Sequence, residues 1–291
     1  MQADELELYK HYVQNNLPTK MSKGSAQRTS IQELATHYDG FLFDGFGTLY
    51  NLTVAHPGAA LMLQGLRANH KKIRLVTNAA SRHPSQLISH LQVLGFDLQE
   101  HEVICSGSLL RQANSQFKIQ EALHIGRTDA LCFLEAAGIQ VSTTPREASV
   151  ILSSSPKDWN HESIAQAEQV LRRPQARLVV LNPDAYAPAI DGSRYPVSGM
   201  LAWQLQKKAG CHLFCLGKPF GEIFAQALAS MDLEPKRCIM VGDTLGTDIA
   251  GAQAAGIDTA LILGGNSSEE SVADDEAALG VSPNYYLPST Y

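Results

Sequence analysis

Several polar side chains each follow an apolar run of the sequence, at the point where a buried strand would end. They are Asp44, Thr77 with Asn78, Lys218, Asp243 and, a few residues later, Asp248. Carboxylate oxygens are ligands that Mg²⁺ prefers, while a hydroxyl, a lysine and backbone N–H groups can hold phosphoryl oxygens. Each of these residues is common on its own, since Asp also caps helices and Lys often lies in a solvated turn. Together, and in this order, they predict a divalent-cation and phosphate site.

Strands must deliver these side chains to one place, and the hydropathy pattern indicates how. Apolar segments of strand length lie at residues 41–43, 73–76, 212–216 and 238–241. Helical periodicity fills much of the remaining sequence after residue 32, for example at residues 57–70 and 83–95. Alternating strands and helices predict an α/β fold of the doubly wound, Rossmann-like class, with a parallel sheet covered on both faces. The carboxyl ends of its strands meet at one edge, where ligands bind.

The composition excludes several other classes of protein. The chain has 291 residues, enough for two domains or one large one, and its 44% hydrophobic and 18% charged residues are typical of globular proteins. A net charge of -6 argues against a nucleic-acid partner. No apolar run has the length of a membrane span, and the first residues, MQADELELYK, carry acids where a targeting peptide carries basic residues. We expect a soluble, cytoplasmic protein that does not bind membranes.

The five cysteines are odd in number and lie mostly in apolar segments, which favours free thiols over a disulfide framework. Cys211, His212 and Cys215 have the residue types of a zinc site. Their segment, CHLFCL, alternates as a strand does, so we expect a strand there and no metal.

Four motifs, FDGFGTL, LVTNAASR, GKPFGEIFAQAL and MVGDTLGTDIAGAQAAGIDTALILGG, resemble those of the haloacid dehalogenase-like (HAD) superfamily. The resemblance covers nearly everything after residue 32 and is closest to class IIA, which includes sugar-phosphate and pyridoxal-phosphate phosphatases. Between Asp44 and Thr77 there is room for little beyond one helix, whereas residues 79–217 can hold an inserted α/β cap domain. The expected organisation is a leader or arm at 1–31, a catalytic core at 32–82 and 203–291, and a cap at 83–202.

The resemblance also implies roles for individual residues. Asp44 matches the nucleophile that forms an aspartyl-phosphate, Thr77 the hydroxyl that binds the phosphoryl group, and Lys218 the cation that orients Asp44. Mg²⁺ is expected on Asp44, Asp243, Asp248 and the backbone carbonyl of Phe46. Expected substrate contacts come from Gly45, Asn78 and the cap loop LNPDAYAP with Asn182 and Asp184, followed by Arg194, which could meet a second anionic group.

Phe46 departs from the pattern, because the phosphatases of the family have their general acid and base at this position. A phenylalanine cannot transfer a proton, and a positioned acid or base is typically worth about 10² to 10⁴ in rate. Three hypotheses follow. The first is a phosphatase for activated substrates, or one whose acid is replaced by His56 or Asp184. The second is a dehalogenase-like hydrolase, and the third is a catalytically impaired protein that binds phosphate and Mg²⁺.

The phosphatase hypothesis comes first, because dehalogenases of the superfamily need no metal and place their cap after the first motif. We therefore expect a Mg²⁺-dependent hydrolase acting on a small phosphorylated metabolite, similar to a sugar phosphate. The resemblance would also permit a homodimer.

Overall fold

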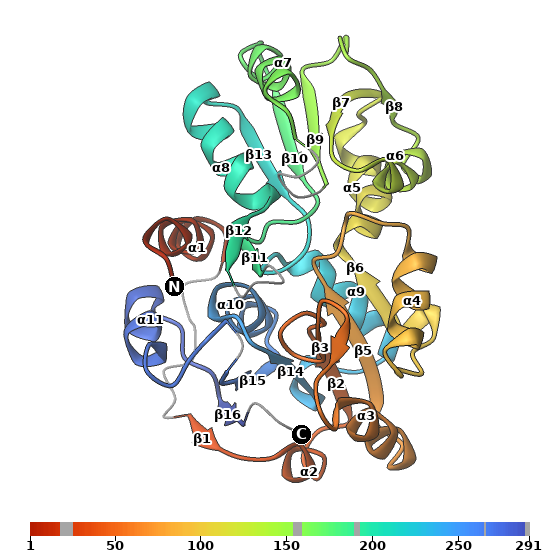
Figure 1. Ribbon diagram of the computed structural model, residues 1–291, viewed down its shortest axis with the longest axis vertical. Coiled ribbons are helices and arrows are strands. Elements are labelled where there is room, and N and C mark those ends of the chain that lie inside the picture. The colour runs from red at the N-terminus through yellow and green to blue at the C-terminus, as the bar shows by residue number, and fades with distance from the viewer. Residues whose placement is uncertain (18–25, 154–158, 189–192, 265, 289–291) are drawn as a thin grey trace. The chain divides into compact units, whose positions relative to one another are not determined.

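The structure is a computed structural model that describes residues 1–17, 26–153, 159–188, 193–264 and 266–288 (Figure 1). The chain folds into two compact units. The first unit consists of Met1–Thr77, Leu87–Ile104 and Lys218–Tyr291, and the second consists of Asn78–Gln86 and Cys105–Gly217. The second unit is therefore an insertion into the first.

Within the described residues, the first unit is built on a sheet of seven strands in the order β1-β16-β15-β14-β2-β5-β6. In chain order the strands are β1 (Gln27–Arg28), β2 (Gly40–Phe43), β5 (Lys72–Thr77), β6 (Val103–Cys105), β14 (Cys238–Gly242), β15 (Asp258–Ile262) and β16 (Tyr285–Leu287). In the order of the sheet, every pair of neighbouring strands between β1 and β5 is parallel. All residues of β2 and β14 are buried, as expected for central parallel strands covered on both faces.

The order of these strands reverses between β2 and β14. From β2 the chain proceeds outward through β5 to β6, and from β14 it proceeds in the opposite direction through β15 to β16. Such a switch point opens a crevice at the carboxyl ends of the two strands. Asp44 directly follows β2, and Asp243 directly follows β14.

Helices and short turns complete the first unit. They are α1 (Ala3–Asn16), α2 (Ile31–Leu34), α3 (Ala59–Ala68), α4 (Pro84–Val93), η1 (Glu100–Glu102), α9 (Gly221–Met231), η5 (Pro235–Arg237), the π-helical turn η6 (Leu245–Ile249), α10 (Ala250–Ala254) and α11 (Val272–Leu279), with the hairpin strands β3 (Tyr50–Asn51) and β4 (Val54–Ala55). Helices α3 and α9 pack on β5, and α10 packs on β15. Helix α4 begins in the second unit and continues into the first.

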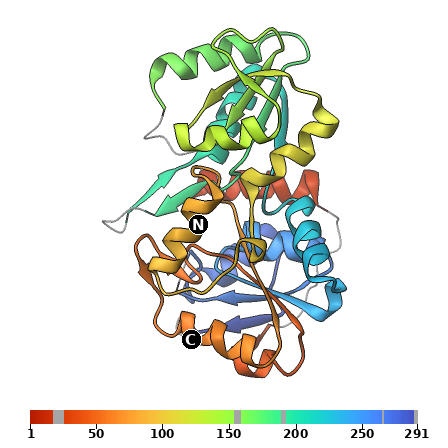
Figure 2. The same ribbon diagram turned by 90° about the vertical axis from the view of Figure 1, so that its right-hand side faces the viewer.

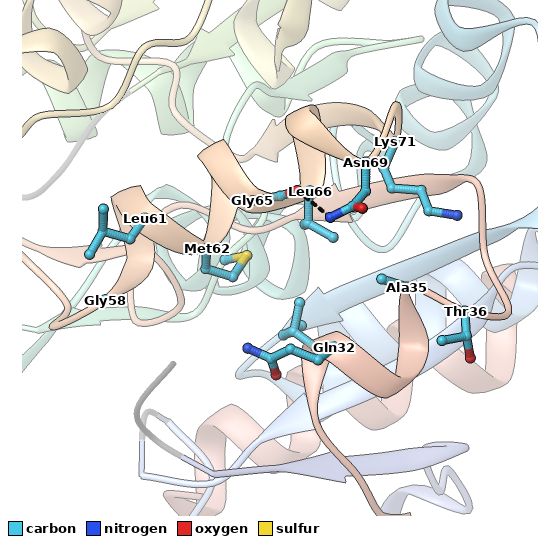
Figure 3. A pocket seen from close by; sticks show the side chains of 11 residues that line it. Gln32, Ala35, Thr36, Gly58, Leu61, Met62, Gly65, Leu66, Asn69 and Lys71 are labelled. Atoms are coloured by element: carbon cyan, nitrogen blue, oxygen red, sulfur yellow. Dashed lines mark hydrogen bonds between the residues drawn. The ribbon is translucent and has the colours of Figure 1, made fainter.

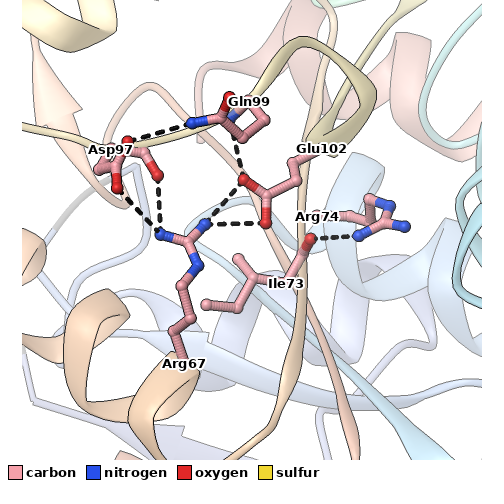
Figure 4. Close-up of polar contacts among 6 residues, drawn as sticks. All are labelled: Arg67, Ile73, Arg74, Asp97, Gln99 and Glu102. Atoms are coloured by element: carbon pink, nitrogen blue, oxygen red, sulfur yellow. Dashed lines mark hydrogen bonds and ion pairs between the residues drawn. The ribbon is translucent and has the colours of Figure 1, made fainter.

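A partly buried ion pair fixes the approach to the edge strand β6 (Figure 4). Arg67 of α3 lies 2.7 Å from Glu102 of η1 and also donates to the backbone oxygen of Asp97 at 2.7 Å. Glu102 accepts a further hydrogen bond from the backbone of Gln99. These contacts hold the segment before β6 against α3.

The second unit has its own parallel sheet, in the order β13-β10-β9-β7-β8 (Figure 2). Its elements are η2 (Ser106–Leu109), α5 (Leu110–Phe117), β7 (Glu121–Ile125), η3 (Thr128–Ala130), α6 (Leu131–Ala136), β8 (Gln140–Val141), β9 (Ser149–Leu152), α7 (His161–Leu171), β10 (Arg177–Val180), the antiparallel hairpin β11 (Tyr186–Pro188) and β12 (Arg194–Pro196), α8 (Ser198–Ala209) and β13 (His212–Cys215). Apolar residues of α7, α8 and the central strands form one buried cluster.

The predicted fold class is confirmed: a doubly wound parallel sheet carries an inserted α/β unit. The boundaries differ from the predicted ones. The second unit extends to Gly217 rather than residue 202, because α8 packs on β10 and β13 pairs with it. Leu87–Ile104 lies in the first unit rather than the cap, where Leu91 is fully buried and Glu102 is held by Arg67.

Two further predictions concern the first 31 residues and the segment after Cys211. Much of the predicted leader is helix α1, which belongs to the first unit and buries Leu8, Tyr9 and Tyr12, so it is not a loose arm. The expected strand after Cys211 is confirmed as β13, and the five cysteines are free thiols. Over the described residues, every helix is too short or too polar to cross a membrane.

Candidate active site

Asp44 lies at the carboxyl end of β2, with its backbone N–H donating to Val241 of the neighbouring strand β14. Its carboxylate oxygen Oδ1 is 2.5 Å from the ammonium nitrogen of Lys218. The same nitrogen lies 2.8 Å from Oδ1 of Asp248, and the Lys218 side chain is 3% exposed. Lys218 therefore bridges two carboxylates in a nearly dry environment, where charge interactions are strong.

The turn after Asp44 packs closely against Asp243, the residue that follows β14. Gly47 has a φ of +82°, and a Cβ at this position would lie 2.1 Å from the carboxylate oxygen Oδ2 of Asp243. Only glycine satisfies both the positive φ and this close approach. The backbone N–H of Tyr50 donates to Gly45, and that of Gly47 donates to Tyr50, which closes the turn.

Asp243 is buried and held by a set of donors. Its Oδ2 accepts the backbone N–H of Asn266 at 2.8 Å, and its Oδ1 accepts the hydroxyl of Thr244 at 3.0 Å. The hydroxyl of Ser267 donates to its backbone oxygen. These bonds fix the carboxylate beside Asp44 rather than leaving it to rotate.

Asp248 comes from the π-helical turn η6, a distortion that is frequent at functional sites. Its side chain is fully buried and accepts the backbone N–H of Thr244 at 3.1 Å. A Cβ on Gly242 would lie 2.3 Å from its carboxyl carbon, so glycine leaves the room that Asp248 occupies. Among the described residues, one oxygen from each of Asp44, Asp243 and Asp248 lies within 4.8 Å of the other two, close enough to share one metal ion.

The charges of this cluster do not balance. Three carboxylates face one ammonium group, and burial raises the pKa of Asp243 to about 6, with the charge of Asp248 adding to the rise. Burial also raises the pKa of Asp44, although the neighbouring Lys218 opposes that rise. A divalent cation would neutralise the remaining charge, and oxygen donors of this kind fit Mg²⁺.

Thr77 is the last residue of β5, and β5 pairs with β2, the strand that delivers Asp44. Its side chain is 5% exposed. Thr77 thus stands at the same carboxyl edge as the acidic cluster, the place expected of a phosphate-binding hydroxyl.

Phe46 lies in the turn after Asp44, and its ring packs edge-on against Tyr50 with the centroids 6.0 Å apart. The ring is half-buried. The position therefore offers the cluster no ionisable group, as the sequence predicts.

His56, one of the two predicted substitute acids, lies against the turn that holds Phe46. Its backbone N–H donates to Leu49, and its ring hydrogen-bonds the backbone of Gly47. Burial lowers the pKa of His56, so the ring is neutral at neutral pH and a poor proton donor there. Its Nε2 is buried and has no hydrogen-bond partner among the described residues.

The other predicted contact residues belong to the second unit, where the structure brings three of them together. Asn78 donates to the carboxylate of Asp184 at 2.7 Å, and the side-chain oxygen of Asn182 accepts the backbone N–H of Asp184 at 2.9 Å. Arg194 of β12 lies over the ring of Tyr186 on β11. Residues 189–192, between this loop and Arg194, lie outside the described residues.

Thr244, Asn266 and Ser267 were not among the predicted site residues. Asn266 and Ser267 follow β15, the next strand of the sheet, so the same strand-end rule could have found them. Their types gave a weaker signal than carboxylates do, since Asn and Ser are common in loops.

A groove of about 600 Å³ lies elsewhere in the first unit, between α2 and α3 (Figure 3). Its lining is mostly apolar and includes Ile31, Met62 and Leu66, with Asn69 and Lys71 at one end. Helix α2 precedes β2 and helix α3 precedes β5, so the chain passes from each helix into the amino end of a strand. The acidic cluster lies at the opposite, carboxyl ends of the strands. The groove therefore does not share residues with the acidic cluster.

Comparisons with known proteins find relatives over most of the chain. Residues 41–140 match the sequence profile of a family described as haloacid dehalogenase-like hydrolase, and residues 215–289 match one described as HAD-hydrolase-like. Chronophin from Mus musculus is 30% identical over 272 residues, which cover 89% of this chain and 93% of that protein. Glycerol-3-phosphate phosphatase from Gallus gallus is 31% identical over 289 residues, covering 89% and 92%.

A solved structure is similar over the whole fold as well. Glycerol phosphate phosphatase Rv1692 from Mycobacterium tuberculosis, in complex with magnesium, superposes with a TM-score of 0.74 at 27% identity, covering 87% of this chain and 76% of that chain.

Proposed function

The chain belongs to the haloacid dehalogenase-like hydrolases, in the class IIA branch, and on this premise we propose that it is a Mg²⁺-dependent phosphatase whose nucleophile is Asp44. The observation that carries the proposal is the double contact of Lys218, 2.5 Å from Asp44 and 2.8 Å from Asp248. A lysine so placed both aligns the attacking carboxylate and meets the charge of an incoming phosphoryl group.

Asp44, Asp243 and Asp248, with the backbone carbonyl of Phe46, would hold the Mg²⁺. The fit rests on three carboxylates that lie close together, where burial, and after it the charge of Asp248, raises the pKa of Asp243 to about 6. When bound, the cation supplies the positive charge that offsets repulsion between a carboxylate and a phosphate dianion. The magnesium in the similar glycerol phosphate phosphatase structure supports the same choice of metal.

In the proposed reaction an oxygen of Asp44 forms a bond to phosphorus while the bond from phosphorus to the leaving oxygen breaks. Lys218 and the Thr77 hydroxyl meet the phosphoryl oxygens, and Gly45 leaves the backbone open beside them. The products are the departing oxygen compound and an aspartyl-phosphate, which water then cleaves to inorganic phosphate. Phe46 can neither protonate the leaving oxygen nor activate the water.

The substrate class follows from this missing proton. A leaving group that is stable as an anion, as in an acyl phosphate or an aryl phosphate, departs without a general acid. We therefore propose small phosphorylated metabolites with activated leaving groups, ahead of ordinary sugar phosphates. Asn78, Asn182, Asp184 and Arg194 would contact the rest of the substrate.

We further propose a cytoplasmic location, a homodimer, and Asp184 as a substitute acid. Dehalogenase chemistry is a weaker candidate, because it gives no role to three carboxylates gathered around one lysine.

The direct test is phosphate release from acetyl phosphate and p-nitrophenyl phosphate, with and without Mg²⁺. We expect the wild type to turn over both substrates only with Mg²⁺, and Asp44→Asn to be inactive. Asp274→Asn, which changes an exposed carboxylate on α11, is the matched control and should behave as the wild type. Failure of the wild type on both substrates would favour a binding role for the site.

A further inference from the structure

Helix α1 buries one of its faces against the rest of the first unit. Leu8, Tyr9 and Tyr12 are at most 2% exposed and recur at the spacing of one helical face. The opposite face, including Gln14, is exposed. The helix packs against α11 and against the turn η6, so its buried face lies on the segment that carries Asp248.

Tyr9 rests directly on the backbone of η6. A Cβ on Gly246 would lie 2.4 Å from Cγ of the Tyr9 ring, so the ring occupies the space that any other residue at 246 would need. Gly246 lies two residues before Asp248 in the same turn. The ring of Tyr9 therefore lies directly against the backbone of the turn that carries Asp248.

Tyr12, one helical turn further along α1, contacts the segment that follows Lys218. Its ring meets that of Phe220 edge-on, with the centroids 5.2 Å apart. Phe220 lies two residues after Lys218, at the start of α9. Two rings on one face of α1 thus brace the two segments that bring Lys218 within 2.8 Å of Asp248.

We propose that Tyr9 and Tyr12 are positioning residues, through which α1 sets the distance between Lys218 and Asp248 and hence the affinity of the site for Mg²⁺. The inference rests on the proposed function, since it assumes that the acidic cluster binds this cation. It adds that a helix outside the four motifs controls the geometry of the metal site. Groups that orient metal ligands from outside the coordination sphere commonly change affinity by about 10- to 100-fold.

The test is calorimetric titration of the full chain with Mg²⁺ alone, well below the melting temperature of each variant. Tyr9→Ala should weaken Mg²⁺ binding about tenfold, and Tyr12→Ala should weaken it in the same direction. Tyr9→Phe, which keeps the ring, and Gln14→Ala on the exposed face should bind within about twofold of the wild type. Leu34→Ala, which would open a cavity in the core next to α2, should lower the melting temperature without changing the Mg²⁺ affinity.

Tyr9→Leu serves where Tyr9→Ala does not fold, because it keeps the apolar volume but removes the flat ring. Tyr9 variants that lose thermal stability yet bind Mg²⁺ as the wild type does would overturn the inference and leave α1 a purely stabilising element. A wild type that binds no Mg²⁺ would instead contradict the proposed function, and with it this inference. The two failures are therefore distinguishable by the wild-type titration.

Discussion

Phe46 separates two properties of the site, which are metal binding and proton transfer. Its half-buried ring packs on Tyr50 and contributes no proton, whereas Lys218 contacts both Asp44 and Asp248. In the proposed reaction, metal binding and phosphoryl transfer to Asp44 would require only the contacts of Lys218 with the two carboxylates. Proton transfer to a leaving alcohol requires a group that the position lacks.

Phe46→Asp should therefore raise the hydrolysis of an unactivated alkyl phosphate, such as glycerol phosphate, by about 10² to 10⁴. Turnover of acetyl phosphate, whose leaving group needs no proton, should change much less. The measurement is kcat for both substrates with saturating Mg²⁺. Phe46→Asn is the matched control because it has the same shape as the aspartate but cannot transfer a proton. Equal rates for the two variants would contradict the assignment.

At the scale of elements, the turn that follows β2 sets the geometry of the acidic cluster. Gly47 combines a φ of +82° with a backbone packed against the Asp243 carboxylate. The strand supplies Asp44, but the turn determines how close Asp243 can come. The sequence marks the turn by its glycines without showing which of them contacts the carboxylate.

Gly47→Ala should abolish measurable Mg²⁺ binding, because its Cβ would lie 2.1 Å from Oδ2 of Asp243. Gly95→Ala is the control, since Gly95 has a φ of +88° but open space around it. That variant carries the conformational strain, about 1–2 kcal/mol, without the clash. Both variants should lose thermal stability, and only Gly47→Ala should lose Mg²⁺ binding by calorimetry. Normal binding by Gly47→Ala would show that the cluster tolerates a displaced Asp243.

The strand ends were predictable because apolar runs followed by a polar residue are visible in the sequence. That pattern predicted Asp44, Thr77 and Asp243 at one edge of a parallel sheet, and the structure has all three there. Although Asn266 and Ser267 also follow a strand, β15, the hydrogen bonds that they donate to Asp243 were not predictable, since neither a backbone N–H nor a loop hydroxyl reveals its partner until the loop is folded. Nor was the packing of α1, because its buried face uses two tyrosines in a segment that is polar on average.

For the whole molecule, the raised pKa of Asp243 links stability to pH. The folded value is about 6, above the ordinary value of 3.8, so between these pH values the folded chain holds more protons than the unfolded chain. Its contribution to the free energy of unfolding is therefore present below about pH 4 and is lost as pH rises through 6. In the metal-free protein the loss is roughly 2–3 kcal/mol.

Chemical denaturation of the metal-free wild type and Asp243→Asn between pH 4 and 7 measures this effect. The stability of the wild type relative to the variant should fall as pH rises, and Mg²⁺ should reverse the trend because it favours the ionised carboxylate. The comparison is needed because His124, whose pKa burial lowers to about 4, contributes with the opposite sign in both proteins. A constant difference across this range would contradict the raised pKa of Asp243.

We infer that Asp44 attacks phosphorus and that Phe46 leaves the second step without a base. Intact mass spectrometry of the full chain, quenched in acid after incubation with acetyl phosphate and Mg²⁺, tests both parts at once. We predict that the wild type gains the mass of one phosphoryl group, located on Asp44 by peptide mapping, whereas Asp44→Asn and a Mg²⁺-free sample gain none. A wild type that releases phosphate without ever carrying it on Asp44, or that carries it on another residue, would contradict the account.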